Sequence, residues 1–116
     1  MINVELSIED NGAFSLSVTG HTGAAKPGFD IVCASVSILT YTVAQCVKNI
    51  FDRGDLLKKP VVTLEYGYAN IVCAPKKEAY QETLHIFKTV QTGYELTSQN
   101  YPQFVKLTVL NKAQSL

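Results

Sequence analysis

The chain has 116 residues, a length that fits one domain and that can bury a core without a metal or disulfide. Apolar residues make up 47% and charged residues 17% of the chain, which excludes a disordered polypeptide. Ten Lys and Arg residues balance ten Asp and Glu residues, so the chain lacks the basic field that drives nucleic-acid binding. We therefore expect one domain over residues 1–116 and no direct DNA binding.

The sequence contains no targeting signal or metal-binding motif, and its cysteine count points to a reducing compartment. No apolar run approaches the roughly 20 residues that a membrane helix needs, and the N-terminus has no basic region or signal-peptide core. Three cysteines are an odd number, which fits free thiols better than a disulfide framework. No Cys or His pair has zinc spacing. We expect a cytoplasmic protein with no membrane partner, no metal and no cofactor.

The first two elements form a hairpin. Apolar and polar side chains alternate over residues 2–8 and again over residues 14–18, the pattern of half-buried strands. Asn11-Gly12 lies between them and predicts a tight turn, because both residues tolerate positive φ. The following residues 20–29 contain three glycines and a proline and predict a mobile loop.

A long helix is predicted over residues 30–53, where apolar residues recur at steps of three and four. Asp30 is a candidate N-cap and Gly54 a candidate stop at the C-terminal end. The helix is apolar around more of its circumference than one sheet can cover. We therefore expect a homodimer to bury the remainder.

The second half of the chain repeats the same order of elements. Residues 61–66 and 69–73 predict a second hairpin, broken at Gly67. Pro75 suits the first turn of a second helix that runs to about Gln99, and residues 104–110 read as a closing strand. The order ββαββαβ predicts an α+β fold, with a largely antiparallel sheet packed against two long helices.

Cys33 and His21 are the two residues whose predicted positions suggest a catalytic function. Cys33 is expected at about the third position of the first helix, where free N–H groups and a partial positive charge favour a thiolate. His21 follows the end of a strand, and the loop between the two residues is long enough to bring imidazole to sulfur. A thiolate–imidazolium pair would make Cys33 a nucleophile, and the same N–H groups could stabilise an oxyanion.

Each of these residues also has a purely structural interpretation. A lone Cys in an apolar helix usually packs in a core, and Cys33 fits that description too. Asp30 either caps the helix or orients His21 as the third group of a triad. Ser37 lies one turn after Cys33 on the same face, where it either donates to the thiolate or bonds back to its own helix.

The remaining reactive residues carry weaker signals. Cys46 and Cys73 lie in apolar patterns and are expected to be buried, and His85 is expected at the surface. Three tyrosines of the second half either line a groove or pack in the core: Tyr66, Tyr68 and Tyr80.

The stretch Gly20-His21, a glycine-containing loop and then Asp30-Ile31-Val32-Cys33 with Ser37 closely resembles the Prp family of ribosomal-processing cysteine proteases. The family pattern is Gly-His, a glycine-containing loop, and Asp-x-x-Cys-x-x-x-Ser. The resemblance implies that Cys33 is the nucleophile and His21 the general base. Asp30 and Ser37 match the supporting positions of the family.

The resemblance also implies a substrate and an assembly. Family members remove a short N-terminal extension from a large-subunit ribosomal protein, after a pair of aromatic residues, and are typically homodimers. The loop between His and Cys is expected to close on the substrate, and here it would bind it through Gly20, Thr22, Gly23, Gly28 and Phe29. Thr22 and Ser35 depart from the alanines common at those positions.

Two other functions remain open at the level of sequence. In the first, the chain is a non-catalytic ribosome-associated binding or assembly factor in which Cys33 only packs. In the second, it is a cysteine-dependent transferase or hydrolase that acts on a small substrate.

Overall fold

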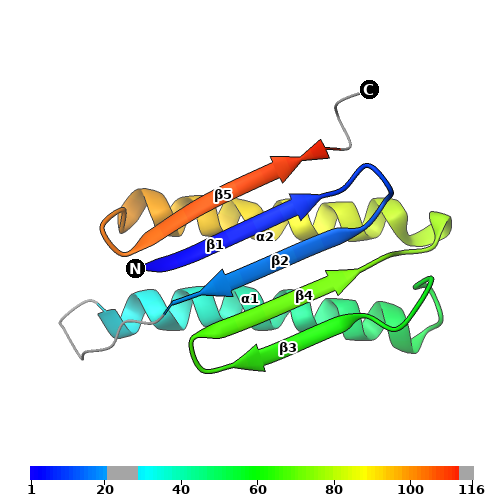
Figure 1. Cartoon of the computed structure of the whole chain (residues 1–116), viewed down its shortest axis with the longest axis horizontal. Coiled ribbons are helices and arrows are strands. Elements are labelled where there is room, and N and C mark those ends of the chain that lie inside the picture. The colour runs from blue at the N-terminus through cyan, green and yellow to red at the C-terminus, as the bar shows by residue number, and fades with distance from the viewer. Residues whose placement is uncertain (21–28, 113–116) are drawn as a thin grey trace.

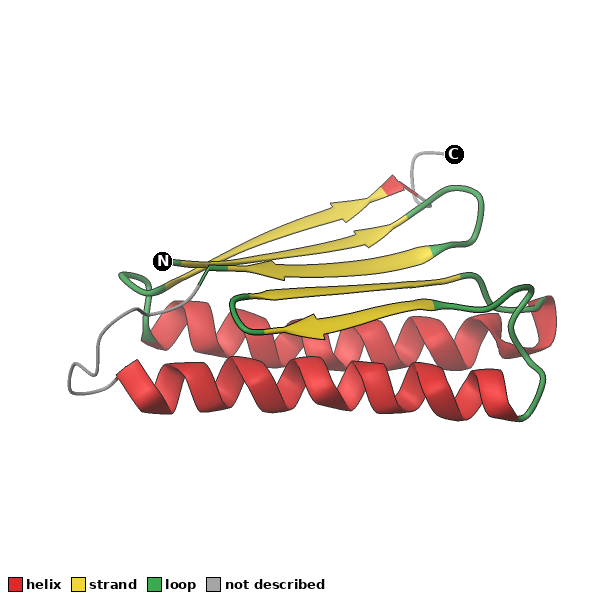
Figure 2. Cartoon of the chain, turned by 60° about the horizontal axis from the view of Figure 1, so that its bottom comes forward, coloured by secondary structure: helices red, strands yellow, loops and turns green. Residues whose placement is uncertain are grey.

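The computed structural model of the chain describes residues 1–20 and 29–112, with the backbone alone at residues 29 and 30. One five-stranded sheet forms one layer, and two helices cover one of its faces (Figures 1 and 2). In chain order the elements are β1 (Ile2–Ile8), β2 (Phe14–Thr19), α1 (Phe29–Asp52), β3 (Val61–Glu65), β4 (Tyr68–Cys73), the 3₁₀ turn η1 (Lys77–Ala79), α2 (Tyr80–Asn100) and β5 (Val105–Asn111).

The strands lie in the order β3-β4-β2-β1-β5. Every neighbouring pair is antiparallel except β1 with β5, which is parallel. The predicted α+β fold, its ββαββαβ order and its largely antiparallel sheet are therefore confirmed. The parallel pair arises because α2 returns the chain to the end of the sheet at which β1 begins, as parallel neighbours require a crossover.

The first turn differs from the tight hairpin that Asn11-Gly12 suggested. Within this turn only Gly12 has a positive φ, of 88°, and no described non-glycine residue of the chain has one. The Glu9 N–H donates to the Ala13 carbonyl at 2.9 Å, and the Asn11 side chain accepts from the Ala13 N–H at 3.0 Å. The connection is longer than a two-residue turn because the Asn11 side chain stabilises it without a left-handed backbone.

The helix ends correct two of the sequence expectations. α1 begins at Phe29, so Asp30 lies inside the first turn and the N-cap prediction was wrong. Pro75 does not begin a helix, because it lies in an isolated bridge to Leu56 and α2 starts only at Tyr80.

The end of α1 agrees with the prediction. Gly54 has a φ of 86°, and the Asp55 N–H donates to the Ile50 carbonyl at 3.1 Å. This bond and the left-handed residue before it form the common glycine stop of a helix.

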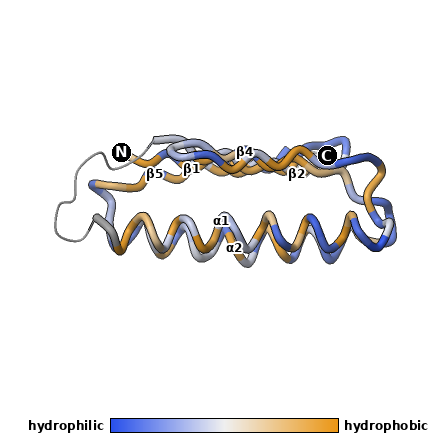
Figure 3. Tube along the Cα trace, turned by 90° about the horizontal axis from the view of Figure 1, so that it is seen from below, coloured by the Kyte–Doolittle hydropathy of each residue, from blue (hydrophilic) through white to orange (hydrophobic). Residues whose placement is uncertain are grey.

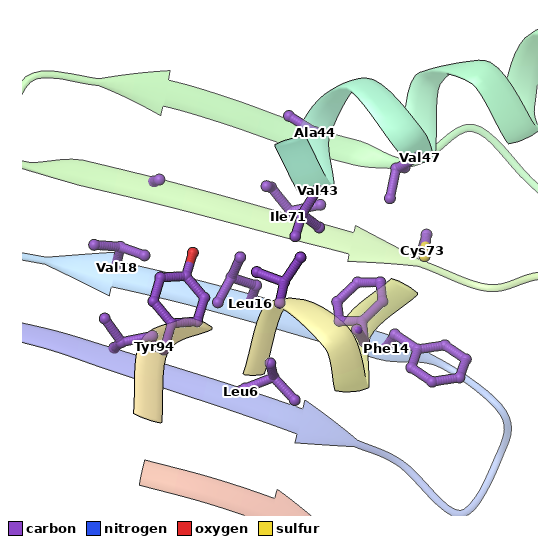
Figure 4. Close-up of a cluster of buried hydrophobic side chains, with 14 of the residues drawn as sticks. Leu6, Phe14, Leu16, Val18, Val43, Ala44, Val47, Ile71, Cys73 and Tyr94 are labelled. Carbon is purple, nitrogen blue, oxygen red and sulfur yellow. The ribbon is translucent and has the colours of Figure 1, made fainter. Parts of the chain in front are cut away.

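The sheet and the two helices form two layers (Figure 3), and buried side chains of the core fill the space between them (Figure 4). Along β1 and β2 the apolar positions face this core, and the polar residues between them point to the open face of the sheet. Tyr94 of α2 is fully buried in the core, and its hydroxyl lies 2.7 Å from Thr40 Oγ1 of α1. Thr40 donates its own proton to the Val36 carbonyl at 2.7 Å, so Tyr94 is the donor to Thr40.

α1 is more exposed than a core helix usually is. Over Ile31–Asp52 the helix is long and apolar enough, by length and composition, to cross a membrane. The expectation that no apolar stretch of the chain approaches the length of a membrane helix was therefore wrong. Core helices of water-soluble proteins meet the same criterion, and here α1 packs against the sheet. Only 33% of its most apolar window is buried, which leaves much of its apolar surface without a partner in the described chain.

The buried thiol of Cys73 and the buried hydroxyl of Tyr94 predict how the free energy of unfolding depends on pH in the alkaline range. Burial raises the pKa of the Cys73 thiol from about 9 to about 12. Burial also raises the pKa of Tyr94 to about 12, against the opposing hydrogen bond with Thr40. We expect a constant free energy of unfolding below about pH 9. Above that pH it should fall towards pH 12, by at most about 1.4 kcal/mol per pH unit for each group, because unfolding releases their protons.

Urea unfolding between pH 8 and 11.5 measures this dependence. Tyr94→Phe removes one of the two titrating groups, so its stability should decline less steeply than that of the unchanged chain. Equal slopes for the two proteins would contradict the role given to Tyr94.

Candidate active site

A cavity of about 380 Å³ lies between the N-terminal half of α1 and the β3–β4 hairpin. It is bounded by the ends of β1 and β2, by one face of α1, and by the hairpin tip. Its lining residues are Ile2, Val18, Gly20, Cys33, Val36, Ser37, Thr40, Tyr41, Leu64, Glu65, Tyr66, Gly67, Tyr68 and Ala69.

Cys33 and Ser37 line this cavity from one face of α1, as their spacing predicted. Cys33 is the fifth residue of the helix rather than the third. Its Cα–Cβ bond nevertheless tilts towards the N-terminus, as in every α-helix, so the sulfur leans over the free N–H groups of the first turn. Cys33 is half-buried and so remains open to the cavity.

Ser37 faces the cavity instead of bonding back to its helix as a structural serine would. The serine that does bond back is Ser35, whose hydroxyl donates to the Ile31 carbonyl at 2.8 Å. Ser37 thus lines the same cavity as Cys33, and its supporting role stays a prediction.

Gly20 fixes the end of β2 at the edge of the same cavity. Its N–H donates to the Gly67 carbonyl at 3.0 Å, in the turn between β3 and β4. Its φ is 95°, and a Cβ there would lie 2.2 Å from the Met1 carbonyl oxygen. Only glycine fits both conditions. The chain therefore leaves β2 for His21, the next residue in the sequence, from a point that borders the cavity of Cys33.

Several predicted site residues lie outside the described part of the chain. His21, Thr22, Gly23 and Gly28 belong to residues 21–28, and of Phe29 and Asp30 only the helical backbone is described. The pairing of His21 with Cys33 and the role of Asp30 therefore stay predictions.

Aromatic and aliphatic side chains make much of the cavity lining apolar. Tyr41 from α1 and Tyr66 and Tyr68 from the hairpin line it together with Leu64. Among the described lining residues the only charged side chain is Glu65. An environment of this kind suits a large apolar side chain of a ligand.

The tyrosines show what the sequence could and could not reveal. Tyr66 and Tyr68 do line a groove, whereas Tyr80 packs on Phe14 with ring centroids 5.4 Å apart. Tyr41 was not predicted as a site residue. It follows Cys33 by eight residues and Ser37 by four, and this spacing keeps all three on one helical face.

A hydrogen bond between the hydroxyl groups of Thr40 and Tyr94 joins α1 to α2 beside the cavity. Thr40 lines the cavity and accepts from buried Tyr94, so its side chain has a fixed orientation. A buried hydroxyl without such a partner would cost about 1–3 kcal/mol. The bond therefore fixes the distance between α2 and the part of the cavity that Thr40 lines.

The other reactive residues lie away from this site. Cys73 is buried, as expected, but Cys46 is only half-buried. None of the three cysteines forms a disulfide with another cysteine. His85 is exposed on α2. Over residues 1–20 and 29–112, no group of three or more His, Cys, Asp and Glu side chains could hold a metal ion.

Comparison with known proteins decides the family. The sequence model of the family described as cysteine protease Prp matches residues 1–106. The chain belongs to the cysteine protease Prp family. Comparison with the curated proteins gave no match.

Solved structures share the fold. The crystal structure of SMU.848 from Streptococcus mutans is 23% identical, with a TM-score of 0.68, and the match covers 97% of this chain and 96% of that one. An essential ribosomal processing protease Prp from S. aureus, in complex with a substrate peptide, is 19% identical with a TM-score of 0.67. The same protease with a covalently linked product peptide is 21% identical with a TM-score of 0.68, and both matches cover 94% of this chain and 99% of the other.

The crowding at Gly20 predicts a stability difference between two glycine variants. Gly54 has a similar positive φ, but nothing lies within 4 Å of its added Cβ. We expect Gly54→Ala to lower the free energy of unfolding by about 1 kcal/mol, from backbone strain alone. Gly20→Ala should cost about 3 kcal/mol or more, because the Met1 carbonyl must also move. Urea unfolding measures both variants, and equal losses would show that β1 yields freely at its first residue.

Proposed function

We propose that this Prp family member is a cysteine endopeptidase that removes a short N-terminal extension from a large-subunit ribosomal protein. The observation that carries the proposal is the position of Cys33. Its half-buried sulfur faces an apolar cavity at which β2 ends, one residue before His21. A nucleophile, a candidate base and a binding site for peptide side chains therefore converge on one edge of the fold.

In the first half of the proposed reaction His21 takes the proton of the Cys33 thiol. The thiolate attacks the scissile carbonyl carbon and forms a tetrahedral intermediate. This intermediate collapses as the C–N bond breaks, and the imidazolium gives its proton to the leaving amine. The N-terminal extension remains on Cys33 as a thioester, and the mature protein departs with a free amino group.

The second half of the reaction releases the extension. A water molecule gives a proton to His21 and adds its oxygen to the thioester carbonyl. The C–S bond then breaks, the thiolate takes the proton back from His21, and the extension leaves with a new carboxyl group. Each cycle consumes one water and restores both side chains, so the reaction needs no cofactor.

The start of α1 supports the charge that develops in both intermediates. Free N–H groups belong to the first turn, which precedes Cys33, and its Cβ leans towards them. The same end of the helix carries a partial positive charge. Hydrogen-bond donors placed in this way stabilise a developing oxyanion and favour the thiolate over the thiol.

The apolar lining of the cavity supports cleavage after aromatic residues. Tyr41, Leu64 and Tyr68 offer a surface on which a phenylalanine or tyrosine side chain can be buried. A volume of about 380 Å³ accommodates such a ring together with adjacent backbone. The structure from S. aureus with a substrate peptide supports a peptide as the ligand.

Assembly and compartment complete the proposal. We propose that the chain acts as a homodimer, because α1 leaves much apolar surface exposed. Three cysteines that form no disulfide fit action in the reducing cytoplasm, where a ribosomal protein is made.

A cleavage assay with single-residue variants tests the roles of Cys33 and His21. The substrate is a peptide with an N-terminal extension that ends in paired aromatic residues, and mass spectrometry identifies the products. We expect Cys33→Ala and His21→Ala to lower kcat/KM by about 1,000-fold or more, because each removes a group that acts in both half-reactions. Cys46→Ser, on the same helix but outside the cavity, should keep its activity.

Two outcomes would contradict this assignment. Turnover by Cys33→Ala at the unchanged rate would exclude Cys33 as the nucleophile. Binding of the peptide without cleavage by the unchanged protein would favour the non-catalytic assembly factor.

The substrate itself provides a second test. Replacing the aromatic residue before the scissile bond with Asp should lower kcat/KM by about 100-fold. The change removes the buried ring and brings a carboxylate into an apolar cavity near Glu65. Asn at the same position separates the loss of the ring from the added charge, and equal rates for the aromatic and Asp peptides would exclude an apolar subsite.

A further inference from the structure

A second cavity, of about 400 Å³, lies between α1 and the outer edge of the sheet. Tyr41 and Leu64 line both this cavity and the cavity of Cys33. The two cavities therefore adjoin each other, and a peptide that leaves one can enter the other. Residues that line only the second cavity include Lys48 and Phe51 on α1, Lys59 before β3 and Val62 in β3.

Both walls of the second cavity expose apolar side chains to solvent. Val62 and Leu64 lie opposite the buried Ile71 and Ala69 of β4, so they point to the helix side of the sheet. They are nevertheless 41% and 43% exposed, because α1 covers only part of the edge strand. Phe51 on α1 is exposed as well. A concave apolar surface of this kind is suited to bind a ligand.

β3 adds backbone groups to this surface. It is the end strand of the sheet beside α1 (Figure 1), and among the described strands it pairs only with β4. The outward N–H and C=O groups of an edge strand can bind an extended peptide as one more strand. Every second side chain of such a peptide points to the helix side of the sheet, where the second cavity lies.

The proposed function determines which part of a substrate reaches the second cavity. It places the aromatic residue before the scissile bond against Tyr41, Leu64 and Tyr68, and two of these three also line the second cavity. Residues further upstream in the extension therefore continue from the aromatic subsite into the second cavity. Glu65 at the end of β3 lines only the first cavity, and Val62 lines only the second. The upstream residues thus run in the same direction as β3.

We propose that the second cavity binds the upstream residues of the N-terminal extension, in an extended conformation parallel to β3. This binding site rests on the proposed protease function, which supplies the substrate. β3 has five residues, so about five residues of the extension lie beside it. About half of their side chains enter the second cavity.

The charge beside the second cavity favours some extensions over others. Lys48 forms an ion pair with Asp52 at 2.6 Å, whereas Lys59 has no ion pair among the described residues. The ammonium group of Lys59 repels a basic side chain that is brought into the cavity. The extension that fits is therefore apolar, with neutral or acidic rather than basic residues at the positions that face the cavity.

Cleavage of a short and a long peptide tests the second cavity. Both peptides carry the same aromatic pair and the same residues after the scissile bond, and the long one has about five further apolar or neutral residues upstream. We expect kcat/KM of the unchanged chain to be about tenfold higher for the long peptide, through a lower KM, because more apolar surface is buried. Equal values for the two peptides would overturn the proposal.

Two neighbouring residues of β3 provide a matched pair of variants. Val62→Asp places a carboxylate in the second cavity, whereas Val61→Asp places it opposite Val72, on the other face of the sheet. Val62→Asp should lower the ratio of the two kcat/KM values from about ten to about one, and Val61→Asp should leave it at about ten. Because both peptides are measured with the same protein, partial unfolding does not change this ratio. Equal ratios for the two variants would count against the second cavity.

A change in the peptide alone avoids any effect on folding. A single Lys is moved through the upstream positions of the long peptide. We expect kcat/KM to fall by about fivefold at alternate positions only, since every second side chain faces the cavity and Lys59. Glu at the same positions should cost less than Lys. A uniform effect of Lys at every position would overturn the extended conformation beside β3.

Peptide binding separates this proposal from the proposed function. Fluorescence polarisation gives the Kd of the labelled long and short peptides with Cys33→Ala, which cannot form the thioester. Tighter binding of the long peptide that Val62→Asp alone abolishes, without cleavage by the unchanged chain, would support the second cavity and reject the protease function. Cleavage of both peptides with equal kcat/KM and equal Kd would reject the second cavity alone. Neither binding nor cleavage would reject both.

Discussion

The hydrogen bond from the Gly20 N–H to the Gly67 carbonyl joins three separate parts of the chain at one point. Gly20 ends β2, Gly67 belongs to the β3–β4 turn, and the Met1 carbonyl lies so close that no Cβ fits between them. One wall of the Cys33 cavity is the hairpin that this bond holds in place. The entry of the chain into the segment with His21 is fixed at the same point. The cavity therefore depends on a backbone contact that only glycine permits.

Much of the fold could be predicted because its signals are local. Alternation over residues 2–8 and 14–18 and the helical spacing after residue 30 each report which face of an element is buried. The parallel pairing of β5 with β1 could not be predicted in this way, since it depends on where α2 delivers the chain. The N-cap at Asp30 and the helix start at Pro75 failed for a related reason. Residues suited to a helix start are also found just inside it, or in a turn before it.

The candidate site shows the same division. Cys33 and Ser37 share a helical face, which spacing alone predicts, and the structure confirms that they face one cavity. The hairpin residues that close this cavity are about 30 positions away in the sequence, and only the order of strands brings them there. Sequence spacing could have included Tyr41 on the α1 face, but it gives no measure of which exposed aromatic residue meets a groove. The relation of His21 to Cys33 remains a prediction that the cleavage assay addresses.

Tyr41 and Leu64 line both the cavity of Cys33 and a second cavity of about 400 Å³ between α1 and β3, and this sharing has a thermodynamic consequence. A ligand that fixes these two side chains in one cavity has already met part of the entropy cost of ordering them for the other. The resulting coupling free energy is reciprocal. Any ligand of the second cavity that strengthens peptide binding beside Cys33 by some factor is itself bound more tightly by the same factor when the peptide is present.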